Sequence, residues 1–269
     1  MKLKNSIKSI AIGSFDGIHQ GHRALIEQVE AVVIIERNGG FLTPGYKRSF
    51  CIKQRCFFYH FEHINGLDAE SFVKKLEEDF PKLETIVVGY DFEFAYKKEG
   101  NTTRLKELFK GEVVVVNEVK SEDISVHSRT IKQYLLKGDI KFVNQLLNRP
   151  YSICGQVISG QGLGKKELVA TLNLKVYDYE LPKEGVYATR TKVKDRWLNS
   201  ISFLGHRVTT DGFFAIETHV LDKDIGTITG KVWIEFVDFI RDNRKFDGLE
   251  ALKNQIKADI KEANNRLNQ

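Results

Sequence analysis

The sequence predicts an α/β domain followed by a β domain that ends in a helix. In the first half of the 269 residues, short apolar runs rich in β-branched side chains alternate with segments of helical periodicity. This alternation is typical of a parallel sheet covered by helices on both faces. After Arg149 and Pro150, short strand-like segments separated by turn residues follow one another without helices. They predict a small antiparallel barrel or sandwich, so we expect two domains, 1–149 and 150–269.

Each predicted strand of the first domain is a continuous apolar run, as expected for strands buried on both faces. These runs are Ile10–Ile12, Val32–Ile35, Cys56–Phe61, Thr85–Val88 and Val113–Val116. Helical periodicity follows the first run from His22 to about Val29, and it returns over Ala69–Phe80. Because ligands of parallel sheets bind beyond the carboxyl ends of the strands, we expect a site near Gly13 and Gly89, which directly follow two strands.

The second domain has shorter segments with strand-like alternation. We expect strands at Tyr151–Ser159, Gly185–Lys194, Trp197–Leu204, Phe213–Leu221 and Thr227–Phe239. In the fourth of these, the apolar set Phe214, Ile216 and Val220 should face the core, with Glu217 on the opposite face. A final helix is predicted by the apolar stripe Leu249, Leu252, Ile256, Ile260, Ala263 and Leu267. Asp247 and Glu250 have the spacing of a capping box at its start.

The composition, 42% hydrophobic and 29% charged, is that of an ordinary soluble globular protein. A net charge of +5 favours phosphorylated small molecules but does not indicate nucleic acid, since the basic residues are dispersed among acidic ones. No apolar run reaches the length of a membrane span. The spacing of Cys51, Cys56 and Cys154 suits neither a metal site nor a redox pair. We expect reduced thiols, a cytoplasmic location, and a monomer or weak homo-oligomer.

The most informative segment runs from Gly13 to His22, at the junction of a predicted strand and a predicted helix. His19 and His22 fall on the same side of a helical turn, and Gly21 between them allows close approach to the backbone. Two imidazoles and the free N–H groups of a helix N-terminus are therefore directed at one point, which suits a phosphate.

This segment resembles the H-x-G-H motif of the nucleotidylyltransferase superfamily. The longer form, G-x-F-D-G-x-H-x-G-H, resembles the bacterial bifunctional riboflavin kinase/FMN adenylyltransferase family. The resemblance implies a Rossmann-like adenylyltransferase domain and a riboflavin-kinase-type barrel with a terminal helix. It also implies that His19 and His22 are catalytic and that ATP phosphates bind at Gly13, Phe15, Asp16 and Gly21.

Two further clusters of the first domain extend the resemblance. Gly89 to Phe94 matches the family's G-x-D-F-x-F, which implies a flavin and nucleotide pocket at Gly89, Asp91 and Phe92. Residues 126–132 occupy the place of the family's I-S-S-T-R-I-R. There the resemblance implies phosphate binding by Ser128 and Arg129 and a catalytic cation, Lys132, for the leaving pyrophosphate. His127 stands where the family has a Ser, and residues 36–54 match the family poorly.

The second domain resembles riboflavin kinase over most of its length. Gly164 and Lys165 take the place of the family's ATP loop. Thr171 and Asn173 take the place of the family's two Mg²⁺ ligands, and their side-chain oxygen atoms suit that hard ion. Tyr187, in Gly185 to Ala188, is implied to bind ATP. Glu217 is implied to be the general base for the riboflavin hydroxyl, while Arg241 and Phe246 are implied to contact the flavin.

The sequence thus predicts an enzyme that phosphorylates riboflavin to FMN and adenylylates FMN to FAD, with riboflavin, FMN and ATP as substrates and Mg²⁺ as the metal. Three alternatives stay open at this point. The kinase domain could be weak, which would leave an FMN adenylyltransferase only. The H-x-G-H motif also serves enzymes that activate pantetheine, nicotinate or glycerol phosphates. Lastly, the chain could be a flavin- or nucleotide-binding regulator without turnover.

Overall fold

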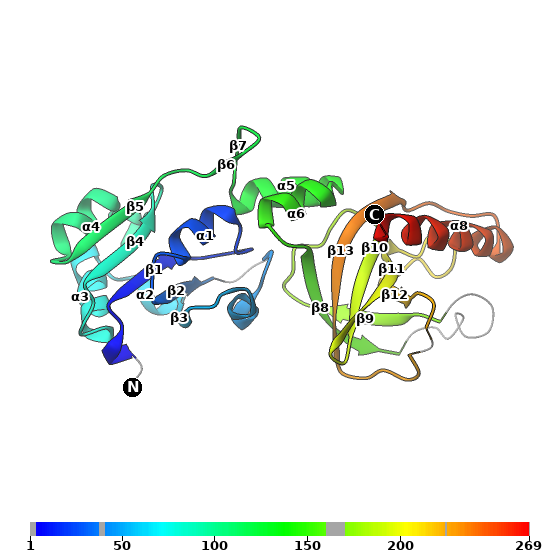
Figure 1. Ribbon diagram of the computed structural model, residues 1–269, viewed down its shortest axis with the longest axis horizontal. Helices are drawn as coiled ribbons and strands as arrows, with labels where there is room; N and C mark the ends of the chain where they lie inside the picture. Colours follow the sequence, from blue (N-terminus) through cyan, green and yellow to red (C-terminus); the bar gives the residue numbers. More distant parts are fainter. Residues whose placement is uncertain (1–3, 38–40, 160–169, 224, 269) are drawn as a thin grey trace. The chain divides into compact units, whose positions relative to one another are not determined.

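The computed structural model describes residues 4–37, 41–159, 170–223 and 225–268 (Figure 1). The chain forms two compact units, Met1–Thr130 and Ile131–Gln269. The division falls inside a helix, upstream of the point at which the sequence texture changes. The boundary between residues 149 and 150 therefore stays a prediction. Among the described residues, no helix combines the length and the apolar character that a membrane span requires.

The first unit contains a five-stranded parallel sheet in the order β3-β2-β1-β4-β5. Its strands are β1 (Ser9–Gly13), β2 (Ala31–Glu36), β3 (Arg55–His60), β4 (Thr85–Gly89) and β5 (Glu112–Val116). Each begins and ends within one or two residues of a predicted apolar run. Because β1 is central and its neighbours β2 and β4 lie on opposite sides of it, the strand order changes direction between β1 and β4. Parallel sheets bind ligands at such a point.

Helices occupy the connections between these strands and continue beyond them. They are α1 (Gln20–Ile26), α2 (Phe61–Ile64), α3 (Ala69–Asp79), α4 (Thr102–Leu108), α5 (Ser128–Lys137) and α6 (Ile140–Leu147). Short 3-10 segments cover Lys4–Ser6, Gly45–Cys51 and Tyr96–Lys98, and a small ribbon pairs β6 (Lys120–Ser121) with β7 (Ile124–Ser125). Side-chain caps start α3, α4 and α6, where Asp68, Asn101 and Asp139 accept hydrogen bonds from first-turn backbone N–H groups.

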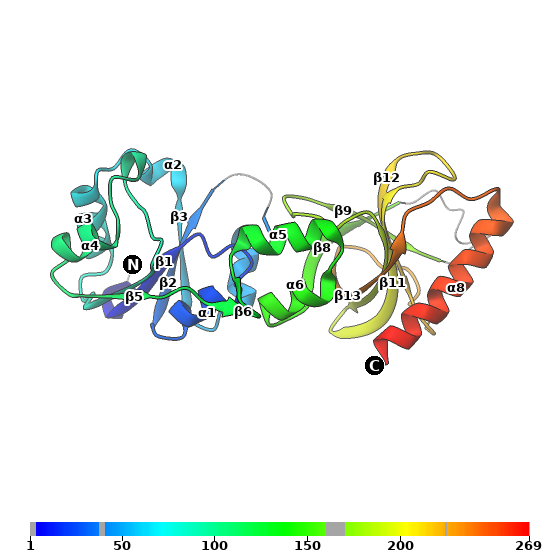
Figure 2. The same ribbon diagram turned by 90° about the horizontal axis from the view of Figure 1, so that it is seen from above.

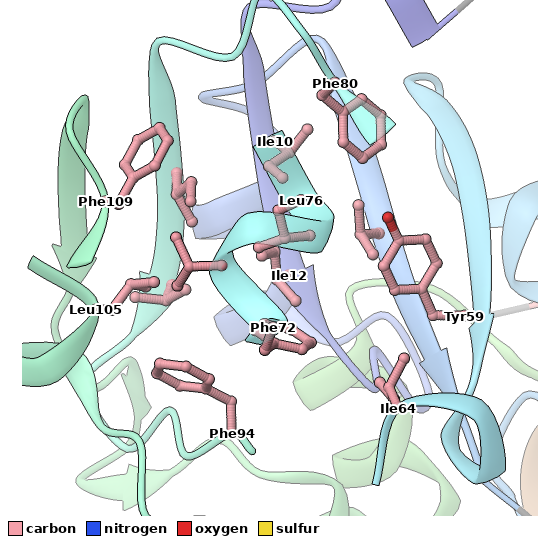
Figure 3. Packing of buried hydrophobic residues seen from close by; sticks show 14 of the residues in the cluster. Ile10, Ile12, Tyr59, Ile64, Phe72, Leu76, Phe80, Phe94, Leu105 and Phe109 are labelled. Atoms are coloured by element: carbon pink, nitrogen blue, oxygen red, sulfur yellow. The ribbon is translucent and has the colours of Figure 1, made fainter. Parts of the chain in front are cut away.

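Successive residues of β1 pack on opposite faces of the sheet. Ile10 and Ile12 belong to a cluster with Leu76 of α3, and Figure 3 shows these side chains meeting between helix and sheet. Ala11 belongs to a second cluster with Leu25 of α1. All three β1 residues are essentially inaccessible to solvent. The continuous apolar run in the sequence thus reflects burial on both faces, as predicted.

The second unit contains a closed antiparallel barrel in the order β10-β11-β12-β9-β8-β13 (Figures 1 and 2). Its strands are β8 (Tyr151–Ile158), β9 (Leu172–Val176), β10 (Gly185–Val193), β11 (Arg196–His206), β12 (Phe214–Val220) and β13 (Lys231–Asp242). Closure satisfies the hydrogen bonds that open sheet edges would leave unpaired. Of the two architectures predicted, barrel or sandwich, the protein therefore adopts the barrel.

Hydroxyl side chains fill part of the barrel interior. Thr189 and Thr191 of β10 bond to Ser200 and Ser202 of β11, and the network continues to Thr218 of β12. The oxygen–oxygen distances are 2.8–3.0 Å, and each of the five side chains is at most 1% exposed. We call this set the hydroxyl network.

The terminal helix α8 (Leu249–Leu267) packs on the outside of the barrel. Ala263 and Leu267 are buried in a cluster with Val186 and Ala188 of β10, and Figure 2 shows α8 running beside the barrel strands. The predicted capping box is wrong. The N-cap is Gly248 at φ 89°, and no side chain caps the helix.

Three other expectations require correction. Helix α1 begins at Gln20 rather than His22, because His19 provides its N-cap, and it ends at Ile26. Phe214 is 44% exposed, so the core face of β12 carries Ile216, Thr218 and Val220 instead. Leu249 lies at the exposed start of α8 and does not extend its apolar stripe.

Candidate active sites

The turn from β1 to α1 has an unusual backbone. Phe15 has φ 48°, Gly17 φ 87° and Ile18 φ 46°, so three of four consecutive residues lie in the left-handed region. Such conformations are unfavourable for Phe and Ile. Both side chains are at most 1% exposed and belong to the cluster around α1. Burial of these two side chains holds the strained turn in place, and the turn in turn sets the direction of the helix start.

His19 and His22 meet at the start of α1. Their rings stack with centroids 3.6 Å apart, and His19 Nδ1 accepts a hydrogen bond from the backbone N–H of His22 at 3.3 Å. Burial lowers the pKa of His19 to about 3, with a smaller contribution from His127. Burial lowers the pKa of His22 as well, followed by the effects of His19, Arg48 and His127. Without a ligand, both imidazoles are therefore neutral at physiological pH, and His22 Nδ1 has no hydrogen-bond partner within the described parts of the chain.

A cavity of about 380 Å³ opens at the carboxyl ends of β1, β2, β4 and β5. The structure brings nine of the sequence-predicted site residues to this one cavity. Its lining includes Gly13, Phe15, His19, Gly21, His22, Gly89, Asp91, Phe92 and Ser128. The side chain of Phe92 also stacks on Phe94, a core residue, with ring centroids 5.5 Å apart. The three motifs that are far apart in the sequence therefore meet where the topology predicts a ligand.

Gly21 allows a close contact at the edge of this cavity. A Cβ atom at position 21 would lie 3.2 Å from ring atoms of His19 and 3.2 Å from the carbonyl oxygen of Val126. These distances are tighter than ordinary van der Waals contacts. A side chain here would displace either the imidazole or the segment that leads into α5.

Two predicted phosphate-binding residues do not line the cavity. Asp16 is 6% exposed, and its Oδ1 accepts a hydrogen bond from the backbone N–H of Thr43 at 3.0 Å. The carbonyl oxygen of Asp16 accepts a hydrogen bond from Ser128 Oγ at 2.8 Å. Asp16 thus joins the β1–α1 turn to the segment after β2 and to the start of α5. Arg129 is exposed.

Sequence reasoning missed other polar residues of the cavity. Tyr90, Glu118 and His127 line it, and the Tyr90 hydroxyl lies 3.2 Å from Glu118 Oε1 and 3.3 Å from His127 Nε2. Glu118 follows β5 by two residues, so its position after a strand could have marked it. His127 could have been marked because it replaces a Ser of the family motif. Arg48, described further below, follows no pattern that the sequence reveals.

The second unit has a cavity of about 180 Å³ beside β9, β11, β12 and α8. Five predicted site residues line it: Thr171, Asn173, Glu217, Arg241 and Phe246. Asn173 of β9 is the direct partner of Glu217 in β12. Thr171 lies just before β9, whereas Asn173 lies on it.

Glu217 is paired with an arginine that the sequence analysis did not single out. Arg207 Nη1 lies 3.3 Å from Glu217 Oε1, and Nη2 lies 2.8 Å from Asp211 Oδ2. Burial raises the pKa of Glu217, and the charge of Arg207 partly offsets this effect. Arg207 Nε is buried without a hydrogen-bond partner among the described residues. A carboxylate with a raised pKa in a cavity is suited to accept a proton.

A second arginine forms another wall of this cavity. The guanidinium of Arg241 makes two-pronged hydrogen bonds to Asp259 of α8, with Nη2 to Oδ2 at 2.7 Å and Nε to Oδ1 at 2.9 Å. It also lies 5.4 Å from the centre of the Phe246 ring. Leu252 and Ile256 of α8 line the same cavity. An aromatic ring and apolar side chains beside fixed charges suit a flat, partly polar ligand.

The remaining predicted site residues lie elsewhere. Tyr187 is 0% exposed, does not line the cavity, donates its hydroxyl proton to the Lys183 carbonyl and packs on Phe236 and Phe239. Lys132 belongs to the second unit, where its Nζ lies 3.8 Å from Glu180 Oε2. Gly164 and Lys165 lie outside the described residues.

The second cavity offers oxygen donors for a metal ion. Thr171, Asn173 and Glu217 line it together, and hydroxyl, amide and carboxylate oxygens are the donors that Mg²⁺ prefers. Within the described parts of the chain, no group of three or more His, Cys, Asp or Glu side chains could hold a metal ion. Cys51, Cys56 and Cys154 are free thiols, as predicted.

Comparison with known families divides the chain into two parts that correspond to the two units of the fold. A family described as FAD synthetase matches residues 2–37 and 49–130, and a family described as riboflavin kinase matches residues 147–267. The first match includes the motif at His19 and His22 and leaves out residues 38–48. The second includes all five predicted residues of the barrel cavity.

Relatives that match over nearly the whole chain include proteins described as bifunctional riboflavin kinase/FMN adenylyltransferase. The protein of Listeria monocytogenes is 28% identical, covering 94% of this chain and 90% of its own. That of Mycoplasma pneumoniae is 26% identical, covering 95% of this chain and 96% of its own. A crystal structure described as a macrolide-efflux protein from Streptococcus pneumoniae is 25% identical, with a TM-score of 0.85, covering 97% of this chain and 95% of its own.

Proposed function

Because the chain belongs to the family of bifunctional riboflavin kinases/FMN adenylyltransferases, it makes FMN from riboflavin and FAD from FMN, and we propose that each reaction takes place in one of the two cavities. Adenylyl transfer is assigned to the cavity of the first unit, and riboflavin phosphorylation to the cavity of the barrel. The observation that carries this division is the convergence of His19, His22 and Asp91 in one cavity and of Asn173 and Glu217 in the other.

In the first cavity, a phosphate oxygen of FMN forms a bond to the α-phosphorus of ATP, and the bond from that phosphorus to pyrophosphate breaks. No covalent enzyme intermediate is required, so catalysis depends on positioning and on stabilising charge. His19, His22 and the N–H groups at the start of α1 are directed at the polyphosphate. Contact with its charge would raise the low pKa values of the two imidazoles toward protonation.

The flavin side of this cavity is assigned to the segment after β4. Phe92 offers an aromatic face, and Asp91 can accept hydrogen bonds from ribose or ribityl hydroxyls. Ser128 at the start of α5 joins the phosphate site, and Lys132 one turn later is proposed to stabilise the leaving pyrophosphate. The role of Lys132 stays a prediction of the family resemblance.

In the barrel cavity, the ribityl 5′-hydroxyl of riboflavin attacks the γ-phosphorus of ATP. Glu217 accepts the hydroxyl proton as the new bond forms and the bond to ADP breaks, and its raised pKa suits that role. Arg241 and Phe246 are proposed to bind the flavin. Thr171 and Asn173 would hold Mg²⁺, which when bound neutralises charge on the ATP phosphates.

Two single substitutions test the division of labour. With riboflavin, ATP and Mg²⁺ supplied and both flavin products followed by chromatography, His22→Ala should form FMN but no FAD. Glu217→Gln should form FAD only when FMN is supplied. Loss of the same step in both variants would contradict the assignment. If the wild-type chain formed FAD only from supplied FMN, the barrel cavity would not phosphorylate riboflavin.

Three expectations are carried forward as predictions. The cytoplasmic location is consistent with the free thiols of Cys51, Cys56 and Cys154. The monomeric or weakly associated state and the absence of nucleic-acid binding rest on composition and charge alone. Sedimentation of the purified chain at several concentrations would test the state of association.

A further inference from the structure

Arg48 is a buried cation with unused hydrogen-bond donors. It lies in the Gly45–Cys51 3-10 segment and is 0% exposed. Its Nη1 is 3.4 Å from Glu36 Oε1, a long distance for an ion pair, while Nε and Nη2 have no hydrogen-bond partner among the described residues. The guanidinium carbon lies 4.8 Å from the centre of the Phe41 ring. A buried guanidinium with so few partners destabilises a fold, so its presence calls for another explanation.

Arg48 lies beside the motif at the start of α1. The charge of Asp16 raises the pKa of Arg48, against a larger lowering by burial, and the charge of Arg48 contributes to the low pKa of His22. The backbone N–H of Thr43, five residues earlier, donates to Asp16 Oδ1 at 3.0 Å. The segment that carries Arg48 is thus joined directly to the β1–α1 turn. Arg48 itself does not line the cavity.

The neutral imidazoles of His19 and His22 bring no positive charge to the cavity. Of the cations that line it, Lys98 is paired with Glu93 at 2.6 Å, and Arg37 is exposed to solvent. Water and salt screen such exposed charges, whereas a buried charge acts over a longer distance. The positive charge of Arg48, which solvent screens only weakly, can therefore attract an anion that contacts the imidazoles.

The segment that carries Arg48 is also where this chain differs from its family. The FAD synthetase match leaves out residues 38–48 and resumes at residue 49. The family resemblance therefore gives no role to Arg48, and its contribution must be argued from this structure.

We propose that Arg48 is a positioning residue of the adenylyl-transfer site, a buried positive charge on the segment joined to the β1–α1 turn, which draws the polyphosphate of ATP onto His19 and His22. It acts through its charge interactions with Asp16 and with His22. The inference rests on the proposed function of the first cavity. Riboflavin phosphorylation in the other unit provides an internal control for the amount of active chain in each assay.

The test compares three variants of the full chain. Arg48→Met, which removes the charge but keeps the length, should lower kcat/KM for FAD formation from FMN by about 10- to 100-fold, mainly through KM for ATP. Arg48→Lys, which keeps the charge, should recover most of that loss. Glu36→Gln, which removes the anion beside Arg48, should lower KM for ATP by about two- to threefold. Riboflavin phosphorylation should be unchanged in all three.

The Glu36 variant separates a charge effect from simple anchoring. If Arg48 only anchors its segment through the ion pair, Glu36→Gln will raise KM for ATP as Arg48→Met does, which overturns the inference. Wild-type FAD formation by Arg48→Met overturns it as well. If Arg48→Met fails to fold, the direction of the Glu36→Gln change still decides. If His22→Ala also forms FAD normally, the proposed function of the cavity fails rather than the role of Arg48.

Discussion

Removal of the Asp259 carboxylate should damage the barrel unit and its reaction together. Asp259 is 3% exposed on α8, and its two oxygens accept hydrogen bonds from Arg241 at 2.7–3.0 Å and from Gln255 Nε2 at 2.8 Å. Asp259→Ala would leave the Arg241 guanidinium without its main partner at the cavity wall. Breaking a buried pair from one side costs about 3–5 kcal/mol in free energy of unfolding. For a unit of this size, that corresponds to a fall in Tm of about 10–20 °C.

The kinetic effect should appear at the flavin. Arg241 lies 5.4 Å from the Phe246 ring, and loss of Asp259 frees it to move away. KM for riboflavin should rise, whereas FAD formation from supplied FMN should keep its wild-type rate at temperatures below the transition. Scanning calorimetry of the full chain and the two flavin assays measure these effects.

Glu262→Ala is the matched control on the same helix. Glu262 pairs with Arg266 at 2.7 Å, but its side chain is 42% exposed. An exposed pair of this kind contributes about 0.3–0.5 kcal/mol, so Tm and riboflavin phosphorylation should hardly change. Asp259→Ala with the same Tm as Glu262→Ala would refute the reasoning that burial gives the Arg241 pair its importance.

Three further predictions follow from the two units. Because burial lowers the pKa of His19 to about 3 and that of His22 well below 6.5, the folded first unit binds fewer protons than the unfolded chain below pH 6.5. Its free energy of unfolding should therefore fall by about 3 kcal/mol between pH 7.5 and pH 5.5. Urea titrations at several pH values should show that this free energy depends less on pH in a His19→Asn/His22→Asn double variant. Gly21→Ala places a Cβ 3.2 Å from the His19 ring and should reduce the rate of FAD formation by at least about tenfold, with riboflavin phosphorylation unchanged. A wild-type rate of FAD formation would argue against the tight fit at position 21. Tyr187→Phe removes a buried hydroxyl and should lower the free energy of unfolding by about 1 kcal/mol. The KM for ATP in riboflavin phosphorylation should stay unchanged, and a raised KM would show that Tyr187 contributes to ATP binding after all.

The strands of both units could be predicted from sequence because burial leaves a strong local pattern. Ile10 to Ile12 are apolar without interruption since helices cover both faces of β1. The first cavity could be predicted from the same rule, because residues that follow neighbouring parallel strands must meet. Gly13 and Gly89 illustrate this, and both line the cavity.

The errors arise where a pattern does not determine a side chain's surroundings. The match around Tyr187 identifies a segment but not the face of β10, and its side chain points into the core. Phe214 is apolar but lies at the exposed end of β12. Arg48 is the clearest case, because a lysine- or arginine-containing loop predicts a surface, and nothing local reports that the folded chain encloses one of its charges.

The hydroxyl network inside the barrel has a consequence for how the strands choose their partners. Thr189 and Thr191 are two residues apart on β10, and both bond to Ser200 of β11, the register partner of Thr189. A shift of one residue between these strands would turn Ala188 or Ile201 inward and strand several hydroxyls against carbon. Apolar side chains in their place would tolerate many alignments, whereas directional bonds accept only one. The wall of the barrel cavity, which Ser202 also lines, is thereby assembled with the correct residues opposite each other.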